Sequence, residues 1–544
     1  MTGGIVHATA GLCVLLLSLG GCDGADQPPR GGSVTVIEAD GIVRPMPLIS
    51  ESALDAEFQA FMFRPLLQEW WEESELRYLT HDENPMALAH RWEYVEPDSS
   101  AIRFHLVTDA RWSDGEPVTA HDVVWSIETR GDPRLAGPRQ HYNDRIESVE
   151  ADDDHTVTVR FSRRYPEMLY HTSGPVAPRH AFAEIDPGEI RTHPTMIEPA
   201  GNLPVSGAFM ISRWERGQQV VLVPNPHFSP RPHLDRIVVR TVPEQTTRMV
   251  EFQTGRVDMM PGAPFFELDR LRREVPDARL ERREGRDYGY VGYNPHRFAP
   301  FADLAVRRAL GHAIDSPSLI SALGMDGFAR PAGGPYAPIL GELHDAEAQA
   351  PLSYDPEKAR RILAEAGFEP GPDGILRRQG TPFRFTLTIN AGNQRRADVA
   401  QIVQQYLRRI GVDMRIESLE TGTYVDRLVG GEPEAFKGSW EIGLSPDLTT
   451  ILGRDAHLNL TRYRNPDVEA LFEQALGQPT REAALPHWRE AARLIAADQP
   501  YTWLYYMDEV VVVHDRLRGT TINTLGTYQN LWEWWVADPE TEEG

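Results

Sequence analysis

Cysteine is nearly absent from this chain of 544 residues. The only two cysteines, Cys13 and Cys22, both precede the part of the chain with a globular composition. Disulfides, thiolate zinc sites, iron–sulfur clusters and cysteine nucleophiles are therefore excluded from the folded body. We expect no metal and no cofactor there.

Basic residues are also much fewer than acidic residues. The chain has 55 lysines and arginines against 80 aspartates and glutamates, which gives a formal net charge of −25. An acidic surface of this kind repels phosphate backbones, so we expect no nucleic-acid partner. Hydrophobic residues make up 41% and charged residues 25%, a globular balance. At about 150 residues per domain, the length predicts about two to four domains.

Long hydrophobic runs are missing as well. The apolar run at 11–20 is shorter than the about 20 residues that a spanning helix needs, and its length suits the centre of a secretory signal peptide. It ends in Leu19-Gly-Gly-Cys22, which resembles a bacterial lipobox and implies acylation of the Cys22 thiol. A plain secretory signal or a mis-assigned start codon is the alternative. The Gly- and Pro-rich residues 24–32 indicate a tether.

Strand-like and helix-like patterns alternate along the body. A capping box is expected at Thr119 and Asp122, and Asp355 is expected to cap a helix that begins at Pro356. This mixture without clean alternation predicts α/β lobes with mixed sheets. Strands are predicted at 34–37, 91–95, 102–106, 156–161, 219–223, 414–416 and 503–513, and helices at 53–67, 245–254, 303–313, 395–410, 468–477 and 482–497.

Catalytic motifs are lacking. The chain has no Walker loop, no dinucleotide fingerprint and no His-Glu-x-x-His helix. The nearest match to a nucleophile elbow, at 443–447, lacks the second glycine, and Pro446 would remove the amide that follows Ser445. The acidic run 152–154 lacks the spacing of a calcium loop, so we expect a solvated turn. We predict that the protein is not an enzyme.

Aromatic residues cluster in three short segments. From spacing alone, packing in a sheet core is favoured over the wall of a binding cleft. The clusters are Tyr288, Tyr290 and Tyr293; Trp503, Tyr505 and Tyr506; and Trp532, Trp534 and Trp535.

Seven blocks of the chain, in order, resemble extracellular solute-binding protein family 5, the dipeptide- and oligopeptide-binding lipoproteins of ABC importers. The most specific block is Trp112-Ser-Asp-Gly-Glu-Pro-Val-Thr-Ala-His-Asp-Val-Val-Trp125. Together the blocks run through nearly all of the mature chain. They lie at 89–106, 112–126, 205–228, 252–258, 294–315, 354–367 and 463–506.

The resemblance implies a two-lobed, periplasmic-binding-protein-like α/β fold with mixed sheets and an additional N-terminal domain. A ligand would bind between lobes that close on it by a hinge motion. The closed form would then dock on ABC permease subunits, and we expect a monomer that is lipid-anchored on the extracytoplasmic side. The expected parts are a signal peptide at 1–21, a tether at 22–32, lobe I at 33–58, 173–287 and 502–544, domain II at 59–172 and lobe III at 288–501.

The resemblance also implies candidate ligand contacts. Hinge strands would border the cleft, which makes Tyr288, Tyr290, Tyr293, Tyr505 and Tyr506 candidates. In peptide-binding members, a segment that Ser50, Glu51, Ser52 and Ala53 match pairs with the ligand backbone like an added strand. Trp440 matches a tryptophan close to the ligand, with plain packing as the alternative. Lys437 is a candidate for meeting a ligand carboxylate, with a solvated surface lysine as the alternative.

One departure from the family concerns the ligand directly. Peptide binders carry an aspartate three residues after this tryptophan, where it neutralises the peptide's α-ammonium. The matching residue here is Gly443. A buried ammonium without a carboxylate is unfavourable, and Glu441 and Asp447 stand at other spacings. We therefore expect a modified or N-blocked peptide, or a ligand that is not a peptide.

Two other function classes stay open at this point. The same fold could serve as a ligand sensor or chaperone without a dedicated permease, which neighbouring genes would decide. A hydrolase is the remaining alternative. Flat peptidase and esterase assays, unchanged by Ser445→Ala, would dispose of it.

Overall fold

The computed structural model describes residues 28–50, 52–72, 75–95, 98–135, 137 and 139–537. The expected signal peptide, the Cys22 anchor and the candidate contact Glu51 lie outside the described residues. Within the described ranges, no helix combines the length and the apolar character that crossing a membrane requires.

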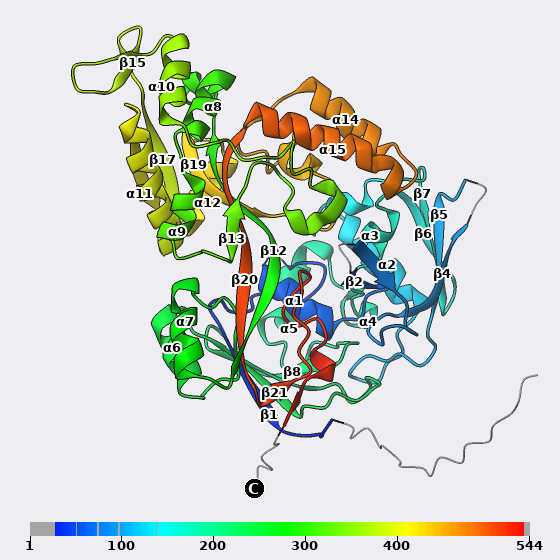
Figure 1. The fold of residues 1–544 in the computed structure, drawn as a ribbon. Helices are drawn as coiled ribbons and strands as arrows, with labels where there is room; N and C mark the ends of the chain where they lie inside the picture. Colours follow the sequence, from blue (N-terminus) through cyan, green and yellow to red (C-terminus); the bar gives the residue numbers. More distant parts are fainter. Residues whose placement is uncertain are drawn as a thin grey trace, which may run out of the picture.

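One mixed sheet of eleven strands runs through the molecule and joins lobe I to lobe III (Figure 1). The strands of lobe I form one end, those of lobe III form the other, and β12 and β20 belong to both. The order is β18-β17-β19-β12-β20-β11-β1-β10-β9-β8, with β13 paired to β20. The bounds are β1 Ser33–Glu38, β8 Phe209–Glu215, β9 Gln219–Pro224, β10 Arg236–Thr241, β11 Met259–Met260, β12 Ala278–Tyr293, β13 Ala329–Pro331, β17 Arg384–Asn390, β18 Asp413–Leu419, β19 Ala435–Glu441 and β20 Tyr501–His514.

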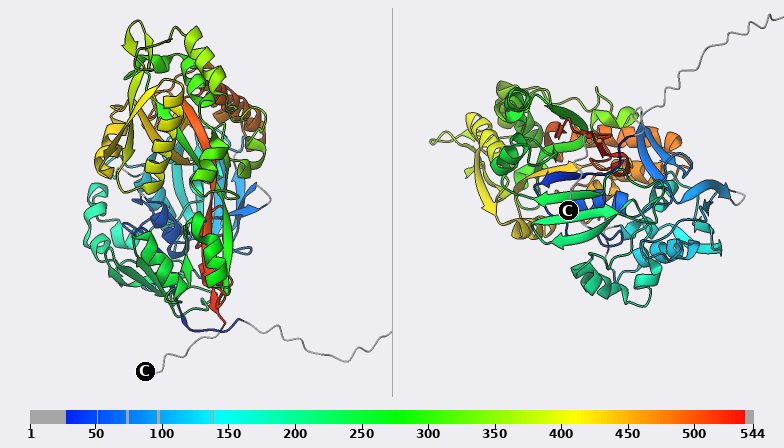
Figure 2. Two further views of the ribbon diagram at one scale, coloured as in Figure 1. Left: turned by 60° about the vertical axis from the view of Figure 1, so that its left-hand side comes forward. Right: turned by 90° about the horizontal axis from the view of Figure 1, so that it is seen from below.

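The long strands β12 and β20 connect the two lobes. They pair antiparallel from Ala278 opposite His514 to Gly292 opposite Tyr501, and Figure 2 shows β20 running from the lower lobe into the upper one. Their register shifts between Arg283 and Asp287. At Gly285, inside this shift, a Cβ would lie 1.7 Å from the carbonyl oxygen of Met507, so only glycine fits. Such bulges bend a strand, here between the lobes.

Domain II is built on a separate antiparallel sheet of order β4-β5-β7-β6. The helix α2 packs against it, and the hairpin β2-β3 packs against the core of lobe III through Trp71 and Leu76. Its elements are β2 Gln68–Glu72, β3 Glu75–Leu79, β4 Ala89–Val95, β5 Ala101–Leu106, α2 Ala120–Gly131, η1 Gln140–Asn143, β6 Ile146–Asp153, β7 Thr156–Phe161 and α3 Met168–Thr172.

Helices cover the lobes on both sides of the large sheet. Lobe I carries α1 Ala53–Met62, α4 Arg179–Phe182, η2 Pro187–Thr192, α5 Pro194–Ile197, α6 Gln245–Gln253, η3 Phe265–Glu267, α7 Leu268–Glu274, β21 Leu517–Arg518, η6 Leu531–Glu533 and β22 Trp535–Val536. Lobe III carries η4 Ala299–Ala302, α8 Leu304–His312, α9 Ser316–Ala322, η5 Pro338–Leu343, α10 Pro356–Glu365, β14 Glu369–Pro370, β15 Leu376–Arg378, β16 Thr381–Pro382, α11 Gln394–Arg409, α12 Thr421–Val429, α13 Thr449–Leu452, α14 Pro466–Leu476 and α15 Arg481–Asp498.

The hydrophobic core is continuous between lobe I and domain II, whereas lobe III has clusters of its own. One buried cluster runs from Val34 and Phe58 of lobe I to Trp112 and Val157 of domain II. Two further clusters lie in lobe III, on the two sides of its part of the sheet. Burial of this extent is the main source of stability, at about 25 cal/mol per Å² of apolar surface.

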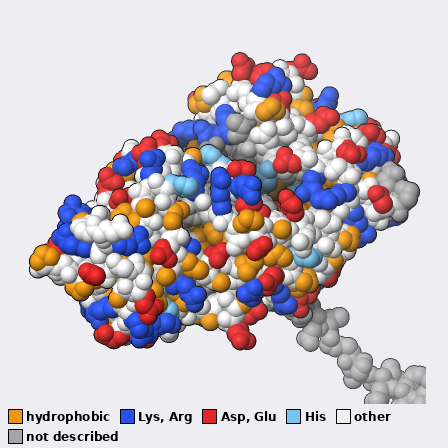
Figure 3. All heavy atoms as spheres, turned by 90° about the horizontal axis from the view of Figure 1, so that it is seen from above, with side chains coloured by type: hydrophobic (Ala, Val, Ile, Leu, Met, Phe, Trp, Pro, Cys, Tyr) orange, Lys and Arg blue, Asp and Glu red, His pale blue; other side chains and the backbone are white. Residues whose placement is uncertain are grey.

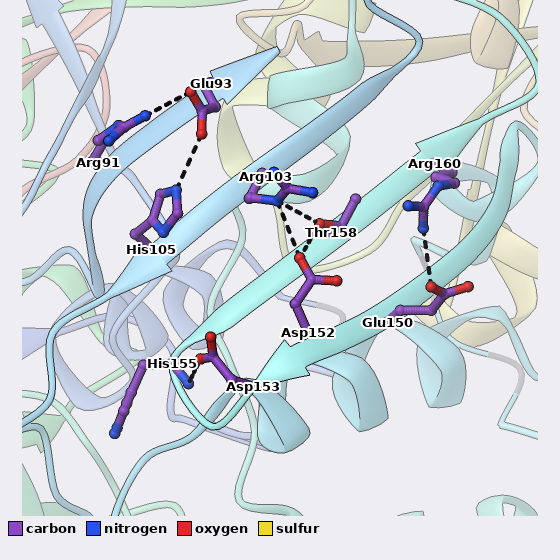
Figure 4. Close-up of polar contacts among 10 residues, drawn as sticks. All are labelled: Arg91, Glu93, Arg103, His105, Glu150, Asp152, Asp153, His155, Thr158 and Arg160. Atoms are coloured by element: carbon purple, nitrogen blue, oxygen red, sulfur yellow. Dashed lines mark hydrogen bonds and ion pairs between the residues drawn. The ribbon is translucent and has the colours of Figure 1, made fainter. Parts of the chain in front are cut away.

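The outer face of the domain II sheet is polar (Figure 4). Cross-strand pairs link Arg103 Nε to Asp152 Oδ2 at 3.1 Å and Arg160 Nη1 to Glu150 Oε2 at 3.1 Å. The acidic run 152–154 is exposed as predicted, but only Asp154 lies in the turn, because Asp152 and Asp153 still belong to β6, where Asp153 accepts from the His155 amide. Among the described residues, no group of three or more His, Cys, Asp or Glu side chains could hold a metal ion.

The surface seen from above carries acidic and basic side chains in mixture, with hydrophobic ones scattered between them (Figure 3). The acidic excess of the composition is therefore not gathered into a single field on this face.

Most of the predicted elements are confirmed. The Asp122 carboxylate accepts from the Thr119 amide at 2.8 Å, and Asp355 caps α10 by accepting from the Lys358 amide at 2.8 Å. The helix predicted at 53–67 is too long, because α1 ends at Met62. The reason is Pro65, which disfavours a helical conformation at the residue before it. The domain boundaries stay predictions.

Candidate functional site

A cavity of about 350 Å³ lies where lobe I, domain II and lobe III meet. Lobe I contributes one face of α1, domain II contributes residues from β2, α2, η1 and α3, and the β12 and β19 strands close the remaining side. Segments more than 450 residues apart in sequence therefore share one site, since Leu525 and Gln529 line the cavity together with Ala53.

The α1 wall is made of small side chains. Ala53, Ala56, Glu57 and Ala60 line the cavity and recur at the spacing of one helix face. The opposite face, with Phe58, is fully buried. The apolar face anchors the helix, and the alanines leave room for a ligand.

The β12 and β19 wall is charged, and its two arginines are paired with carboxylates. Arg286 Nη2 contacts Glu441 Oε1 at 2.8 Å, and Arg283 Nη1 lies 3.6 Å from Glu57 Oε1. Arg283 also pairs with Glu509 on β20. Each arginine of this wall therefore has a carboxylate of its own.

Two carboxyl groups near the hinge strands have raised pKa values. Burial raises the pKa of Glu57 to about 7, although Arg283 and the amide of Thr527 oppose the shift. Burial, and then the charge of Glu441, raises the pKa of Asp287 to about 7. Near neutral pH, the region around the hinge strands therefore carries less negative charge than the number of its carboxyl groups suggests.

The domain II wall holds two arginines and two tyrosines. Arg130 Nε donates to Asn143 Oδ1 at 2.7 Å, and its guanidinium lies 5.6 Å from the centre of the Tyr142 ring. Burial lowers the pKa of Arg130 to about 10. The rings of Tyr142 and Tyr170 lie 5.7 Å apart. This wall can donate hydrogen bonds and offer aromatic surface to a solute.

Domain II and lobe III contact each other beside the cavity. Arg481 of α15 forms an ion pair with Glu167, whose side chain is only 1% exposed. Arg164 Nε donates to the Pro479 carbonyl at 3.2 Å. A Cβ added to Gly443 would lie 3.4 Å from the Tyr170 hydroxyl. These contacts bring the two parts together around the cavity.

Three of the predicted site residues line this cavity, namely Ala53, Glu441 and Gly443. Ser50 is buried outside the cavity lining. Ser52 caps α1, because its hydroxyl accepts from the Asp55 amide at 3.0 Å.

The predicted tyrosines lie in the core of lobe III rather than in the cavity wall. Tyr288, Tyr290, Tyr293, Tyr505 and Tyr506 are each at most 5% exposed. Tyr293, for example, shares a hydrogen bond of 2.8 Å with the Thr502 hydroxyl. Helices cover both faces of the hinge strands there, so side chains on either face are packed, as spacing alone favours. Their contact with a ligand stays a prediction.

Lys437 and Trp440 also lie off the cavity lining. Lys437 is 1% exposed, and its Nζ donates to the Gly438 carbonyl at 2.6 Å. Burial lowers its pKa well below the ordinary value. The alternative of a solvated surface lysine is therefore wrong. Trp440 is partly buried against the core of lobe III. The ligand contacts expected of both residues stay predictions.

Most of the charged residues of the cavity are not predicted from the sequence. They are Glu57, Glu69, Arg130, Arg139, Arg283 and Arg286. Helical spacing could have found the face that Glu57 shares with three alanines. The domain II arginines carry no such signal, because only the packing of the domain against α1 brings them to the site.

Comparison with known proteins places this geometry in a family. The model for bacterial extracellular solute-binding proteins, family 5 (middle), matches residues 85–454. The oligopeptide-binding protein AppA of Bacillus subtilis is similar at 27% identity over 443 residues, covering 78% of this chain and 79% of that protein. Heme-binding protein A of Haemophilus influenzae is 25% identical over 466 residues, covering 81% and 82%.

The fold has a close counterpart among solved structures. The structure of Bacillus subtilis AppA in complex with a nonapeptide superposes with a TM-score of 0.81 at 23% identity, covering 94% of this chain and 100% of that chain. These relatives are named as binding proteins rather than enzymes. Because the family model matches more than half of the sequence, the chain belongs to family 5 of the bacterial extracellular solute-binding proteins.

Proposed function

We propose that this protein captures a peptide or peptide-like solute in the cavity between its lobes and delivers it to an ABC permease without changing it chemically. The proposal includes anchoring of a monomer through Cys22 on the extracytoplasmic face of the cell membrane. The observation that carries it is the cavity itself, whose walls come from lobe I, domain II and lobe III.

The dimensions and the walls of the cavity support this function. A volume of about 350 Å³ falls within the range of small-molecule sites. Arginine, glutamate and tyrosine side chains around alanines suit a solute with amide groups and charged ends. The long strands β12 and β20 are suited to a hinge between lobes that enclose and release such a solute.

The serine of the nearest match to a nucleophile elbow is not activated by a base. The Ser445 hydroxyl accepts from the Asp447 amide at 3.2 Å, and among the described residues no histidine is hydrogen-bonded to it. Binding without catalysis is therefore the function we propose.

Titration calorimetry with free and N-acetylated tripeptides tests the proposal. We expect one solute per protein, and N-acetylated tripeptides should bind at least as tightly as free ones, because position 443 lacks a carboxylate. Ala56→Trp, which fills the α1 wall, should weaken binding about ten-fold or more.

Val250→Trp is the matched control, because Val250 is exposed on α6 and lies away from the cavity. Thermal unfolding would verify that both variants fold. The absence of binding by the wild type, or equal binding by Ala56→Trp and the control, would contradict the proposal.

A further inference from the structure

Two guanidinium groups of domain II line the cavity without an ion pair among the described residues. Among the described residues, Arg130 donates only through Nε, to Asn143, and its buried Nη2 has no acceptor. The side chain of Arg139 has no hydrogen bond or ion pair within the same part of the chain. This wall differs from the opposite one, where Arg283 and Arg286 are each paired with a carboxylate.

The two groups lie close enough to affect each other. Burial is the main cause of the lowered pKa of Arg130, and the charge of Arg139 lowers it further. Both residues line the same cavity. Like charges that are partly removed from water are unfavourable unless an anion joins them.

The cavity's own acids do not fill this role. Glu69 is the carboxyl group of this wall, and it forms no ion pair with either arginine in the described chain. Its side chain instead accepts a long hydrogen bond of 3.4 Å from Ser173. Burial raises the pKa of Glu69 even though the charge of Arg139 opposes the shift, so this carboxyl compensates Arg139 only in part and from beyond ion-pair distance.

Neighbouring residues hold the Arg130 guanidinium in one orientation before any ligand binds. Asn143, which holds its Nε, donates in turn to the Ile127 carbonyl of α2 at 2.7 Å. The ring of Tyr142 supports the guanidinium from the side. A guanidinium fixed in this way loses little freedom on binding, and its donors match the two oxygens of a carboxylate.

We propose that Arg130 and Arg139 form a carboxylate-binding subsite, so that the solute is held by its acid group rather than by an amine. The inference rests on the proposed function and specifies its ligand as a peptide-like acid. The acid end lies against domain II, and the remainder of the solute runs along α1 towards Gly443. The carboxylate belongs to a chain end or to an acidic side chain.

Equilibrium dialysis against defined peptide mixtures tests this subsite, with mass spectrometry to measure the bound fraction. One mixture contains N-acetylated tripeptide acids, and the other contains the same sequences as C-terminal amides. We expect the wild type to retain the acids about ten-fold or more over the amides. Amides that contain glutamate, compared with those that contain glutamine, distinguish a side-chain carboxylate from a chain end.

The preference for acids should disappear in Arg130→Gln and in Arg139→Gln. Arg464→Gln is the matched control, because Arg464 is exposed on lobe III and its loss changes the net charge equally. If Arg130→Gln fails to fold in a thermal unfolding assay, Arg139→Gln decides the question.

The possible outcomes separate the two proposals. Equal retention of peptides with and without a carboxylate, or an unchanged preference in Arg139→Gln, would overturn the subsite and leave the proposed function in place. Failure of the wild type to retain any peptide would contradict the proposed function, and the subsite with it.

Discussion

Replacing Gly443 by aspartate should give the cavity a preference for tripeptides with a free α-amine, with an affinity gain of about ten-fold or more over the wild type. Gly443 lines the cavity, and its added Cβ would meet only the Tyr170 hydroxyl, at 3.4 Å, and the Ser445 amide nitrogen, at 3.9 Å. The new side chain therefore has room, and its carboxylate would be available to an ammonium group.

Gly443→Asn is the matched control, because it adds a side chain of the same shape without the charge. Calorimetry with free and N-acetylated tripeptides would measure the difference between the two variants. If Gly443→Asp bound both peptide forms as the wild type does, the link between position 443 and the missing amine site would be wrong.

In the wild type, we expect the free energy of unfolding to fall as the pH rises from 5 to 8. Replacing Glu38 by glutamine should abolish this decrease. Glu38 ends β1, and its carboxyl accepts a hydrogen bond of 2.5 Å from Tyr528. Burial raises its pKa to about 8. Glu57 and Glu509 add to the shift, while the Tyr528 hydroxyl and Arg248 oppose it.

The direction of the effect follows from proton linkage. The folded state binds the Glu38 proton more tightly than the unfolded state. The contribution of this group to the free energy of unfolding is therefore fully present below its ordinary pKa. It is lost as the pH rises through about 8. The loss in the free energy of unfolding is at most about 4 kcal/mol by pH 8.

Urea unfolding at pH 5 and at pH 8 measures the change. We expect the variant to match the wild type at pH 5 and to exceed it at pH 8. Glu184→Gln, at an exposed position, is the matched control and should follow the wild type at both values. Equal pH dependence of Glu38→Gln and the wild type would refute the assignment.

Local patterns in the sequence predict the elements of the fold well. The Thr119–Asp122 capping box and the Asp355-Pro356 helix start depend only on neighbouring residues, and both are found as expected. The length of α1 was overestimated because its apolar face continues past the point where Pro65 ends the helix. The periodicity of apolar residues indicates which side chains are buried, whereas the end of the helix depends on the backbone restriction that Pro65 imposes.

The lining of the cavity is harder to predict from the sequence, for a physical reason. Tyr290 and Lys437 lie on strands that border the lobes, but helices cover these strands in lobe III and bury both side chains. Arg130 and Arg139 reach the cavity only through the packing of domain II against α1. The resemblance identified the region of the cleft, and the side chains that face it depend on contacts between distant segments.

Hydrogen exchange with bound N-acetylated tripeptides tests the central claim most directly. If the solute is enclosed between the lobes, amide protection should rise together in α1, in residues 139–143 of domain II and in residues 441–445 of lobe III. Binding that leaves these segments unchanged, or that protects only one of the three parts, would contradict capture in this cavity.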